Sequence, residues 1–236
     1  MLNVLFLGNS LMYYNDMPQI FASIATAAGK QVRVVSVTKG SATLSDFADE
    51  STVVGAQAIS LLKNECWDVV VIEPSRRISP YETSVREAEL ASAKKLQELA
   101  RTAGGEIVLY AVWGNNNGSV VEFHALTPTN MMRVATHPMS RKPHTDFLHA
   151  VCAEFAEALE GVRIAEVGYA FENSIARYPD LELYHTDQRH PSQNGSYLAA
   201  CVIYGTIFGE RVLGNRFSVG DFTQRLQVIA DETICL

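Results

Sequence analysis

The sequence is poor in basic residues relative to acidic ones. Its 236 residues include 19 Lys and Arg against 26 Asp and Glu, which gives a net charge of −7. Binding to nucleic acids through phosphate contacts requires clustered Lys and Arg, so this composition argues against a nucleic-acid partner. Neither GxGxxG nor GxxxxGK[ST] occurs. Because these are the motifs that cradle phosphates, we expect no nucleotide cofactor, and nothing else in the sequence indicates another cofactor.

Cysteines and long apolar runs are also scarce. The four cysteines are widely spaced and form no CxxC pair, so neither a zinc cage nor a dense disulfide framework is indicated, and reduced core thiols are expected. No apolar run reaches the length of a membrane span. The opening MLNVLFLG lacks the basic start and the cleavage site of a signal peptide. We therefore expect a cytoplasmic protein with no membrane partner; the sequence does not indicate its oligomeric state.

What the sequence does contain is an alternation of short β-branched runs with longer helical patterns. A hydrophobic content of 47% suffices for one well-buried domain over residues 1–236. Strands are expected at residues 3–8, 31–37, 68–73, 106–113 and 162–167. Helices are expected at residues 16–29, 53–64, 82–103, 144–160 and 192–209. The first, third and fourth strands are continuously apolar, as strands buried on both faces of a parallel sheet should be.

This alternation predicts an α/β fold, a three-layer α/β/α sandwich with an open parallel sheet of about five strands. In such sheets ligands gather beyond the carboxyl ends of the strands. Residues 8–10, Gly40 and residues 73–77 each follow an expected strand and should meet at this edge. Residues 114–143, rich in Asn, Pro, Thr and His, are expected to form a long loop near the active site, because such long loops are often functional.

Two short segments at opposite ends of the chain suggest a nucleophilic site. Ser10 follows the first strand, in the loop before the helix that is expected to start near Asp16. A serine hydroxyl needs a histidine to take its proton and usually a carboxylate to hold the imidazole in the right tautomer. Asp187 and His190 have the spacing to form such a pair. Pro191 disfavours helical backbone at His190, which keeps that histidine in a loop.

These segments resemble two sequence blocks of the SGNH (GDSL-type) hydrolase superfamily. GNSL at residues 8–11 is similar to its first block, with Asn9 in place of the more frequent Asp. DxxHP at residues 187–191 is similar to its last block. Gly40 follows the second strand, where the superfamily places the glycine of its second block. The resemblance extends from residue 3 to about residue 209.

The resemblance implies a flavodoxin-like sandwich and a role for each matching residue. Ser10 would be the nucleophile and His190 the general base and then acid. Asp187 would orient the imidazole. The backbone N–H groups of Ser10 and Gly40 would donate hydrogen bonds to the oxyanion.

The third block of the superfamily, GxND, does not match. It should fall at residues 73–76, where the sequence reads EPSR, so the oxyanion asparagine is missing from its place. Loss of one oxyanion donor typically costs about 10²–10³ in turnover. Ser75 or Arg76 could replace this donor, as could Asn115 or Asn116 from WGNNNG, which follows the fourth strand. The pattern resembles a divergent branch of the superfamily.

The function predicted from these residues is that of a serine esterase acting on small esters. Residues 114–143 include no long apolar lid, which favours short acyl groups, such as acetyl, on a carbohydrate or another polar scaffold. Asn9, Glu73 and Trp113 are candidate substrate-binding residues, although Trp113 could instead pack in the core and Glu73 could pair with a neighbouring arginine.

Three other functions remain open at this point. The first is a non-catalytic ligand-binding module, the second a thioesterase- or lysophospholipase-type acyl hydrolase, and the third a flavodoxin-like protein that binds FMN or a phosphate ester. The HxDxxH pattern of His185, Asp187 and His190 has the ligand types of a divalent-metal site. No second acidic or histidine cluster matches it, so no metal is expected.

Overall fold

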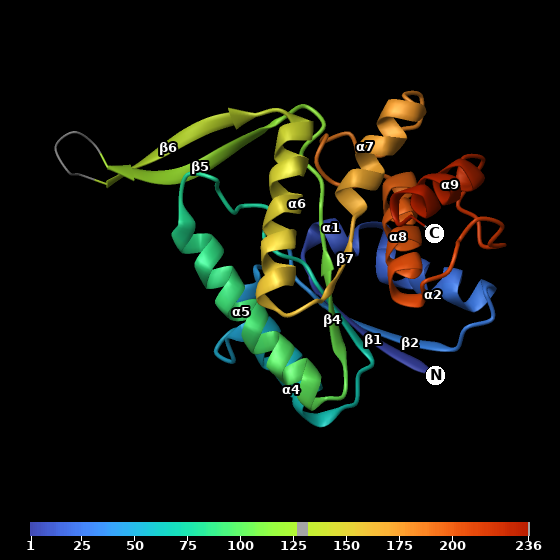
Figure 1. Ribbon diagram of the computed structural model, residues 1–236, viewed down its shortest axis with the longest axis horizontal. Coiled ribbons are helices and arrows are strands. Elements are labelled where there is room, and N and C mark those ends of the chain that lie inside the picture. Colours follow the sequence, from blue (N-terminus) through green and yellow to red (C-terminus); the bar gives the residue numbers. More distant parts are fainter. Residues whose placement is uncertain (127–131, 236) are drawn as a thin grey trace.

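The computed structural model describes residues 1–126 and 132–235 (Figure 1). Five parallel strands form the central sheet in the order β2-β1-β3-β4-β7. Their bounds are Leu2–Gly8 (β1), Val32–Thr38 (β2), Val69–Ile72 (β3), Glu106–Tyr110 (β4) and Arg163–Ala165 (β7). All five lie where the sequence predicts strands, and the predicted α/β class with its parallel sheet is confirmed.

The central strands are apolar throughout because both of their faces are covered. Val4 and Phe6 of β1 belong to one hydrophobic core, whereas Leu5 and Leu7 belong to the other. This division follows from the two-residue period of a strand, which sends successive side chains to opposite faces of the sheet.

Helices cover both faces of the sheet and complete the three layers (Figure 1). The first core contains residues of Met17–Ala27 (α2), Val167–Arg177 (α7), Gln193–Phe208 (α8) and Thr223–Thr233 (α9). The second core contains residues of Leu44–Ala48 (α3), Val53–Asn64 (α4), Thr83–Thr102 (α5) and Arg141–Ala158 (α6). Figure 1 shows α5 and α6 to the left of the sheet and α8 and α9 to its right. Of these eight helices, α3, α7 and α9 were not predicted.

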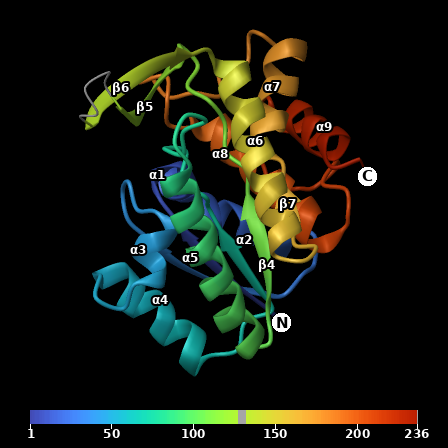
Figure 2. The same ribbon diagram turned by 60° about the vertical axis from the view of Figure 1, so that its left-hand side comes forward.

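The segment 114–143 differs from the predicted long loop. Ser119–Leu126 (β5) and Met132–Met139 (β6) pair as an antiparallel hairpin that extends away from the sandwich in both views (Figures 1 and 2). Residues 127–131 of this segment lie outside the described residues. The side chains of β5 alternate in exposure, with Val121 buried and Val120 66% exposed. Pairing of the strands also satisfies backbone groups that would otherwise need water or side chains as partners.

The start of the first helix also differs from the prediction. Ser10 does not lie in a loop but begins a short helix, Ser10–Tyr13 (α1), which a 3-10 turn at Tyr14–Asp16 (η1) separates from α2. Asn15 and Asp16 have φ angles of 53° and 57°. This left-handed backbone interrupts the helix, and Asn and Asp adopt it more readily than most residues.

The helices and the cysteines bear on two expectations from composition, the absence of a membrane span and the presence of reduced core thiols. None of the helices in the described ranges combines the length and the apolar character that crossing a membrane requires. All four cysteines are free thiols; Cys152 and Cys201 are buried, as expected of core thiols, but Cys66 and Cys235 are exposed.

Candidate active site

Ser10, His190 and Asp187 form a continuous chain of hydrogen bonds at the carboxyl edge of the sheet. The His190 Nε2 atom lies 2.9 Å from Ser10 Oγ, although the two residues are 180 positions apart in sequence. On the other side of the ring, His190 Nδ1 lies 2.5 Å from Asp187 Oδ2. A neutral imidazole that donates from Nδ1 presents Nε2 as an acceptor, so this arrangement orients a base toward the serine hydroxyl.

The end of β1 fixes the position of Ser10. Asn9 caps α1, since its Oδ1 accepts the N–H of Leu11 at 3.1 Å and its Nδ2 donates to the carbonyl of Ala42 at 3.4 Å. These backbone contacts engage both polar atoms of Asn9, which is buried, so its side chain supports the serine rather than facing a ligand. A Cβ at Gly8 would lie 2.6 Å from Met12 Sδ and 2.8 Å from Glu73 Oε2, so a larger residue there would force these side chains to move.

Asp187 also folds the loop that carries the histidine. Its Oδ1 accepts the backbone N–H groups of Arg189 at 3.0 Å and His190 at 2.9 Å. Partial burial acts to raise the pKa of Asp187, but the hydrogen bonds from the His190 ring and from these two N–H groups hold the pKa well below its usual range. The carboxylate therefore stays ionised and can stabilise an imidazolium at His190.

Two residues that the sequence did not assign tie the serine segment to the histidine loop. The Tyr14 ring stacks on His190, with centroids 4.1 Å apart and planes at 6°. Asn15 Nδ2 donates to the carbonyl of Pro191 at 3.1 Å and to Ser196 Oγ at 2.9 Å. The Asn-Asp pair at the expected start of the helix is a sequence signal for this turn, because both residues tolerate left-handed backbone.

Trp113 does not lie where a substrate could touch it. Its side chain is buried and stacks on Phe171 with centroids 4.0 Å apart. Its Nε1 donates to the carbonyl of Arg189 at 3.1 Å. Asn116 holds the same loop, because its backbone N–H donates to the carbonyl of Gln188 at 2.9 Å. WGNNNG thus supports the loop of His190, and the substrate-binding role predicted for Trp113 is wrong because core packing takes up its ring.

Glu73 lies beneath the serine and not in an open pocket. It is 1% exposed, and its Oε2 accepts the N–H of Asn9 at 3.0 Å. Burial raises its pKa to about 7, against the opposing effect of the hydrogen bond from Asn9. Within the described ranges neither Arg76 nor Arg77 is at ion-pair distance from Glu73. Because its carboxyl group is buried, Glu73 does not face an open pocket, in contrast to the substrate-binding role predicted for it.

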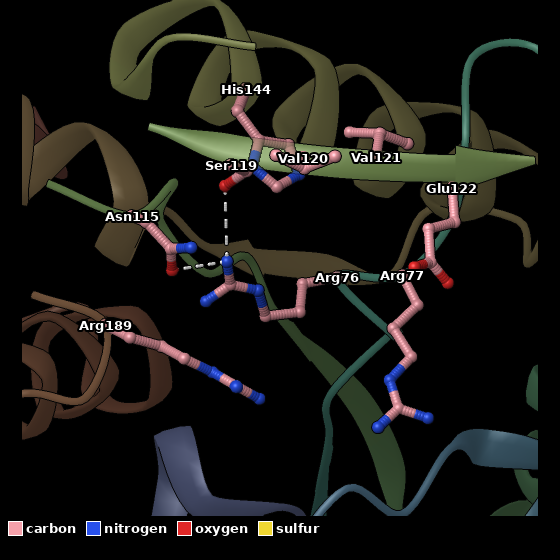
Figure 3. A pocket seen from close by; sticks show the side chains of 9 residues that line it. All are labelled: Arg76, Arg77, Asn115, Ser119, Val120, Val121, Glu122, His144 and Arg189. Atoms are coloured by element: carbon pink, nitrogen blue, oxygen red, sulfur yellow. Dashed lines mark hydrogen bonds between the residues drawn. The ribbon is translucent and has the colours of Figure 1, made fainter. Parts of the chain in front are cut away.

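The EPSR turn after β3 leads into a cavity of about 370 Å³ (Figure 3). Its lining residues are Arg76, Arg77, Asn115, Ser119, Val120, Val121, Glu122, His144 and Arg189. Arg76 Nη2 donates to Asn115 Oδ1 at 2.5 Å and to Ser119 Oγ at 3.4 Å. Ser75 is buried beside this cavity, and its Oγ accepts the N–H of Arg77 at 3.2 Å. The sequence indicated neither the cavity nor the position of Arg189, since residues distant in sequence form its walls.

The two backbone N–H groups that the resemblance assigns to the oxyanion are free of other acceptors among the described residues. In residues 1–126 and 132–235, neither the Ser10 N–H nor the Gly40 N–H donates a hydrogen bond to another group. Gly40 lies beside α1, since a Cβ there would be 3.3 Å from Tyr13 Oη.

The same described part of the chain contains no group of three or more His, Cys, Asp or Glu placed to hold a metal ion.

Comparison with solved structures identifies similar folds. A candidate SGNH hydrolase from Slackia heliotrinireducens is 30% identical, with a TM-score of 0.65 over 87% of this chain and 98% of that chain. A DUF4886 family protein from Bacteroides uniformis is 14% identical, with a TM-score of 0.75 over 99% and 95%. A variant of Axe2, an acetyl-xylooligosaccharide esterase from Geobacillus stearmophilus, is 15% identical, with a TM-score of 0.56 over 93% and 97%. No family model and no curated protein matches the sequence.

Proposed function

Because the chain belongs to the SGNH hydrolase superfamily, we propose that it is a serine esterase in which Ser10 is the nucleophile. The observation that supports this proposal is the hydrogen-bond chain from Ser10 Oγ through His190 to Asp187. A serine hydroxyl in such a chain can lose its proton to the imidazole as it attacks a carbonyl carbon.

In the proposed reaction, Ser10 Oγ forms a bond to the ester carbonyl carbon while its proton moves to His190 Nε2. The resulting oxyanion accepts hydrogen bonds from the N–H groups of Ser10 and Gly40. When the intermediate collapses, the carbon–oxygen bond to the alcohol breaks, and His190 returns the proton to the leaving oxygen. Water, deprotonated by His190, then attacks the acyl-enzyme, which releases the acid and restores the Ser10 hydroxyl.

A third oxyanion donor is proposed to come from Asn115 and not from Ser75. Asn115 lines the cavity beside the histidine loop, Arg76 donates to its carbonyl oxygen, and no described residue accepts a hydrogen bond from its NH₂ group, which can therefore donate to the oxyanion. Ser75 is buried against the backbone of Arg77. This assignment would replace the asparagine of the missing GxND block with one from the next strand.

The proposed substrate is a short-acyl ester on a polar scaffold. Only Val120 and Val121 among the residues that line the cavity are aliphatic, and most of the others are polar or charged, which suits a polar scaffold on the alcohol side of the ester. The fold likeness to an esterase that acts on acetyl-xylooligosaccharides is consistent with an acetyl group on a carbohydrate.

The test compares Ser10→Ala with Ser60→Ala, a matched control on the exposed face of α4. With p-nitrophenyl acetate, Ser10→Ala should lose at least about 10³-fold in kcat, whereas Ser60→Ala should match the wild type. Circular dichroism and Tm check that both variants are folded. Full turnover by folded Ser10→Ala would remove Ser10 from the mechanism. Failure of the wild type to cleave oxygen esters and thioesters of any acyl length would favour a ligand-binding module.

A further inference from the structure

Three guanidinium groups converge on the cavity beside the histidine loop. Arg76 and Arg77 belong to the EPSR turn after β3, and Arg189 immediately precedes His190. Figure 3 shows the Arg76 and Arg189 side chains extending toward the same open space from opposite walls, with Arg77 at its edge. The base of the β5–β6 hairpin forms the remaining wall. The cavity therefore concentrates positive charge in a protein whose net charge is −7.

No carboxylate among the described residues, 1–126 and 132–235, forms an ion pair with these three arginines. Glu122 also lines the cavity, but on the side of Arg77, and it supplies one negative charge against three positive ones. The Nη1 atom of Arg76 is buried, and the described part of the chain offers it no hydrogen-bond partner. A buried donor without a partner is costly, so Arg76 has hydrogen-bonding capacity that a ligand can satisfy.

The electrostatic state of Arg76 agrees with this geometry. Burial, and then the nearby charge of Arg189, lower the pKa of Arg76 to about 10, while Glu73 opposes the shift. Two guanidinium groups that line one cavity repel each other, and the repulsion is relieved when an anion binds between them. The fork of N–H groups on each guanidinium matches the oxygen spacing of a carboxylate or a phosphate.

We propose that this cavity binds an anionic oxyacid group, carboxylate or phosphate, on the alcohol part of the ester that Ser10 cleaves. The inference rests on the proposed esterase function and specifies its substrate class. Ser10 does not itself line the cavity, but two chain connections link the cavity to the reacting serine. Arg189 adjoins His190, and the EPSR turn begins at Glu73, whose carboxylate holds the N–H of Asn9 immediately before Ser10.

The experiment uses three aryl acetates that differ in the group para to the acetate, and each kcat/KM is divided by the uncatalysed hydrolysis rate of the same ester to remove the difference in leaving-group reactivity. 4-Acetoxybenzoate carries a carboxylate, 4-acetoxyphenyl phosphate carries a phosphate, and 4-acetoxybenzamide is neutral. Arg77→Gln and Arg189→Gln each remove one charge at an exposed cavity residue, so folding should persist. Arg101→Gln is the matched control, because it removes the same charge from an exposed position in the last turn of α5.

For at least one anionic ester, the normalised wild-type kcat/KM should exceed that of the neutral ester by about tenfold or more; this quotient is the charge-preference ratio. Arg77→Gln and Arg189→Gln should each reduce that ratio about tenfold, and Arg101→Gln should leave it unchanged. Of the two anionic esters, the one with the larger ratio in the wild type shows whether the cavity prefers a carboxylate or a phosphate. A ratio near one, or a ratio that the two cavity variants do not reduce, would overturn the proposal while leaving the esterase function intact.

A binding measurement separates this proposal from the esterase proposal. Calorimetry with 4-hydroxybenzoate, 4-hydroxyphenyl phosphate and 4-hydroxybenzamide requires no turnover. If the wild type cleaves none of the acetates but binds one of the anionic phenols in an Arg77- and Arg189-dependent way, the esterase function fails and the anion site stands. If neither anionic phenol binds more tightly than the amide and no ester is cleaved, both proposals fail.

Discussion

Replacement of Glu73 by Gln should change the pH dependence of stability. The carboxyl group of Glu73 is fully buried beneath Asn9, and its Oε1 has no hydrogen-bond partner among the described residues. Burial therefore disfavours its charged form and raises the pKa from 4.5 to about 7. Gln has the shape of the protonated acid and can still accept the Asn9 N–H, so Glu73→Gln mimics the neutral state at every pH.

The sign and size of the effect follow from linkage. Between pH 4.5 and pH 7 the folded state retains a proton that the unfolded state has lost, so the free energy of unfolding falls as pH rises. The contribution is fully present below pH 4.5 and is lost once pH passes about 7. Each pKa unit corresponds to about 1.4 kcal/mol. A rise from 4.5 to about 7 therefore costs the wild type about 3 kcal/mol at pH 8.5 relative to the neutral group.

Urea unfolding at pH 4.5 and pH 8.5 measures this difference directly. Glu73→Gln and the wild type should have similar stability at pH 4.5, and the variant should be more stable by about 3 kcal/mol at pH 8.5. Other titrating groups are common to both proteins and cancel in the comparison. The control is Glu98→Gln, an exposed residue on α5, which should show no pH-dependent difference. The same stability difference between Glu73→Gln and the wild type at both pH values would refute the reasoning.

Two further predictions concern the partners of His190. Asp187→Asn should keep the fold but lower kcat by up to about 10⁴-fold, because an amide no longer selects the His190 tautomer that donates from Nδ1. Steady-state ester hydrolysis measures this loss. A loss below tenfold would contradict the orienting role of Asp187. Tyr14→Leu removes the ring that stacks on His190. It should lower kcat/KM about 2- to 12-fold, the factor that corresponds to the free energy of one aromatic pair. Tyr14→Phe retains the stack and should stay within twofold of the wild type, and equal losses in both variants would show that the hydroxyl, not the stacked ring, matters.

Much of the fold was predictable because its signals are local. Val69–Ile72 is apolar at every position, which indicates a strand buried on both faces. Val53–Asn64 was predicted at its observed bounds, and Thr52, whose Oγ1 accepts the N–H of Gly55, caps its start. The serine and histidine motifs were recognisable because each occupies a short stretch next to a strand or a helix.

The features that were missed depend on contacts between distant segments. Whether Trp113 faces a ligand or the core depends on Phe171, which packs on its ring. The hairpin was hidden by the Pro- and Thr-rich composition of residues 114–143, although its strands alternate in exposure. The cavity arginines come from two loops that are distant in sequence, so no sequence period could reveal their convergence.

Covalent labelling of the serine tests the central claim most directly. A fluorophosphonate reacts with a serine hydroxyl only where a neighbouring base activates it. After incubation of the folded protein, peptide mass spectrometry should find one adduct, on Ser10, and His190→Ala should greatly slow its formation. An adduct on another serine, or an unlabelled Ser10 in folded wild-type protein, would contradict the account.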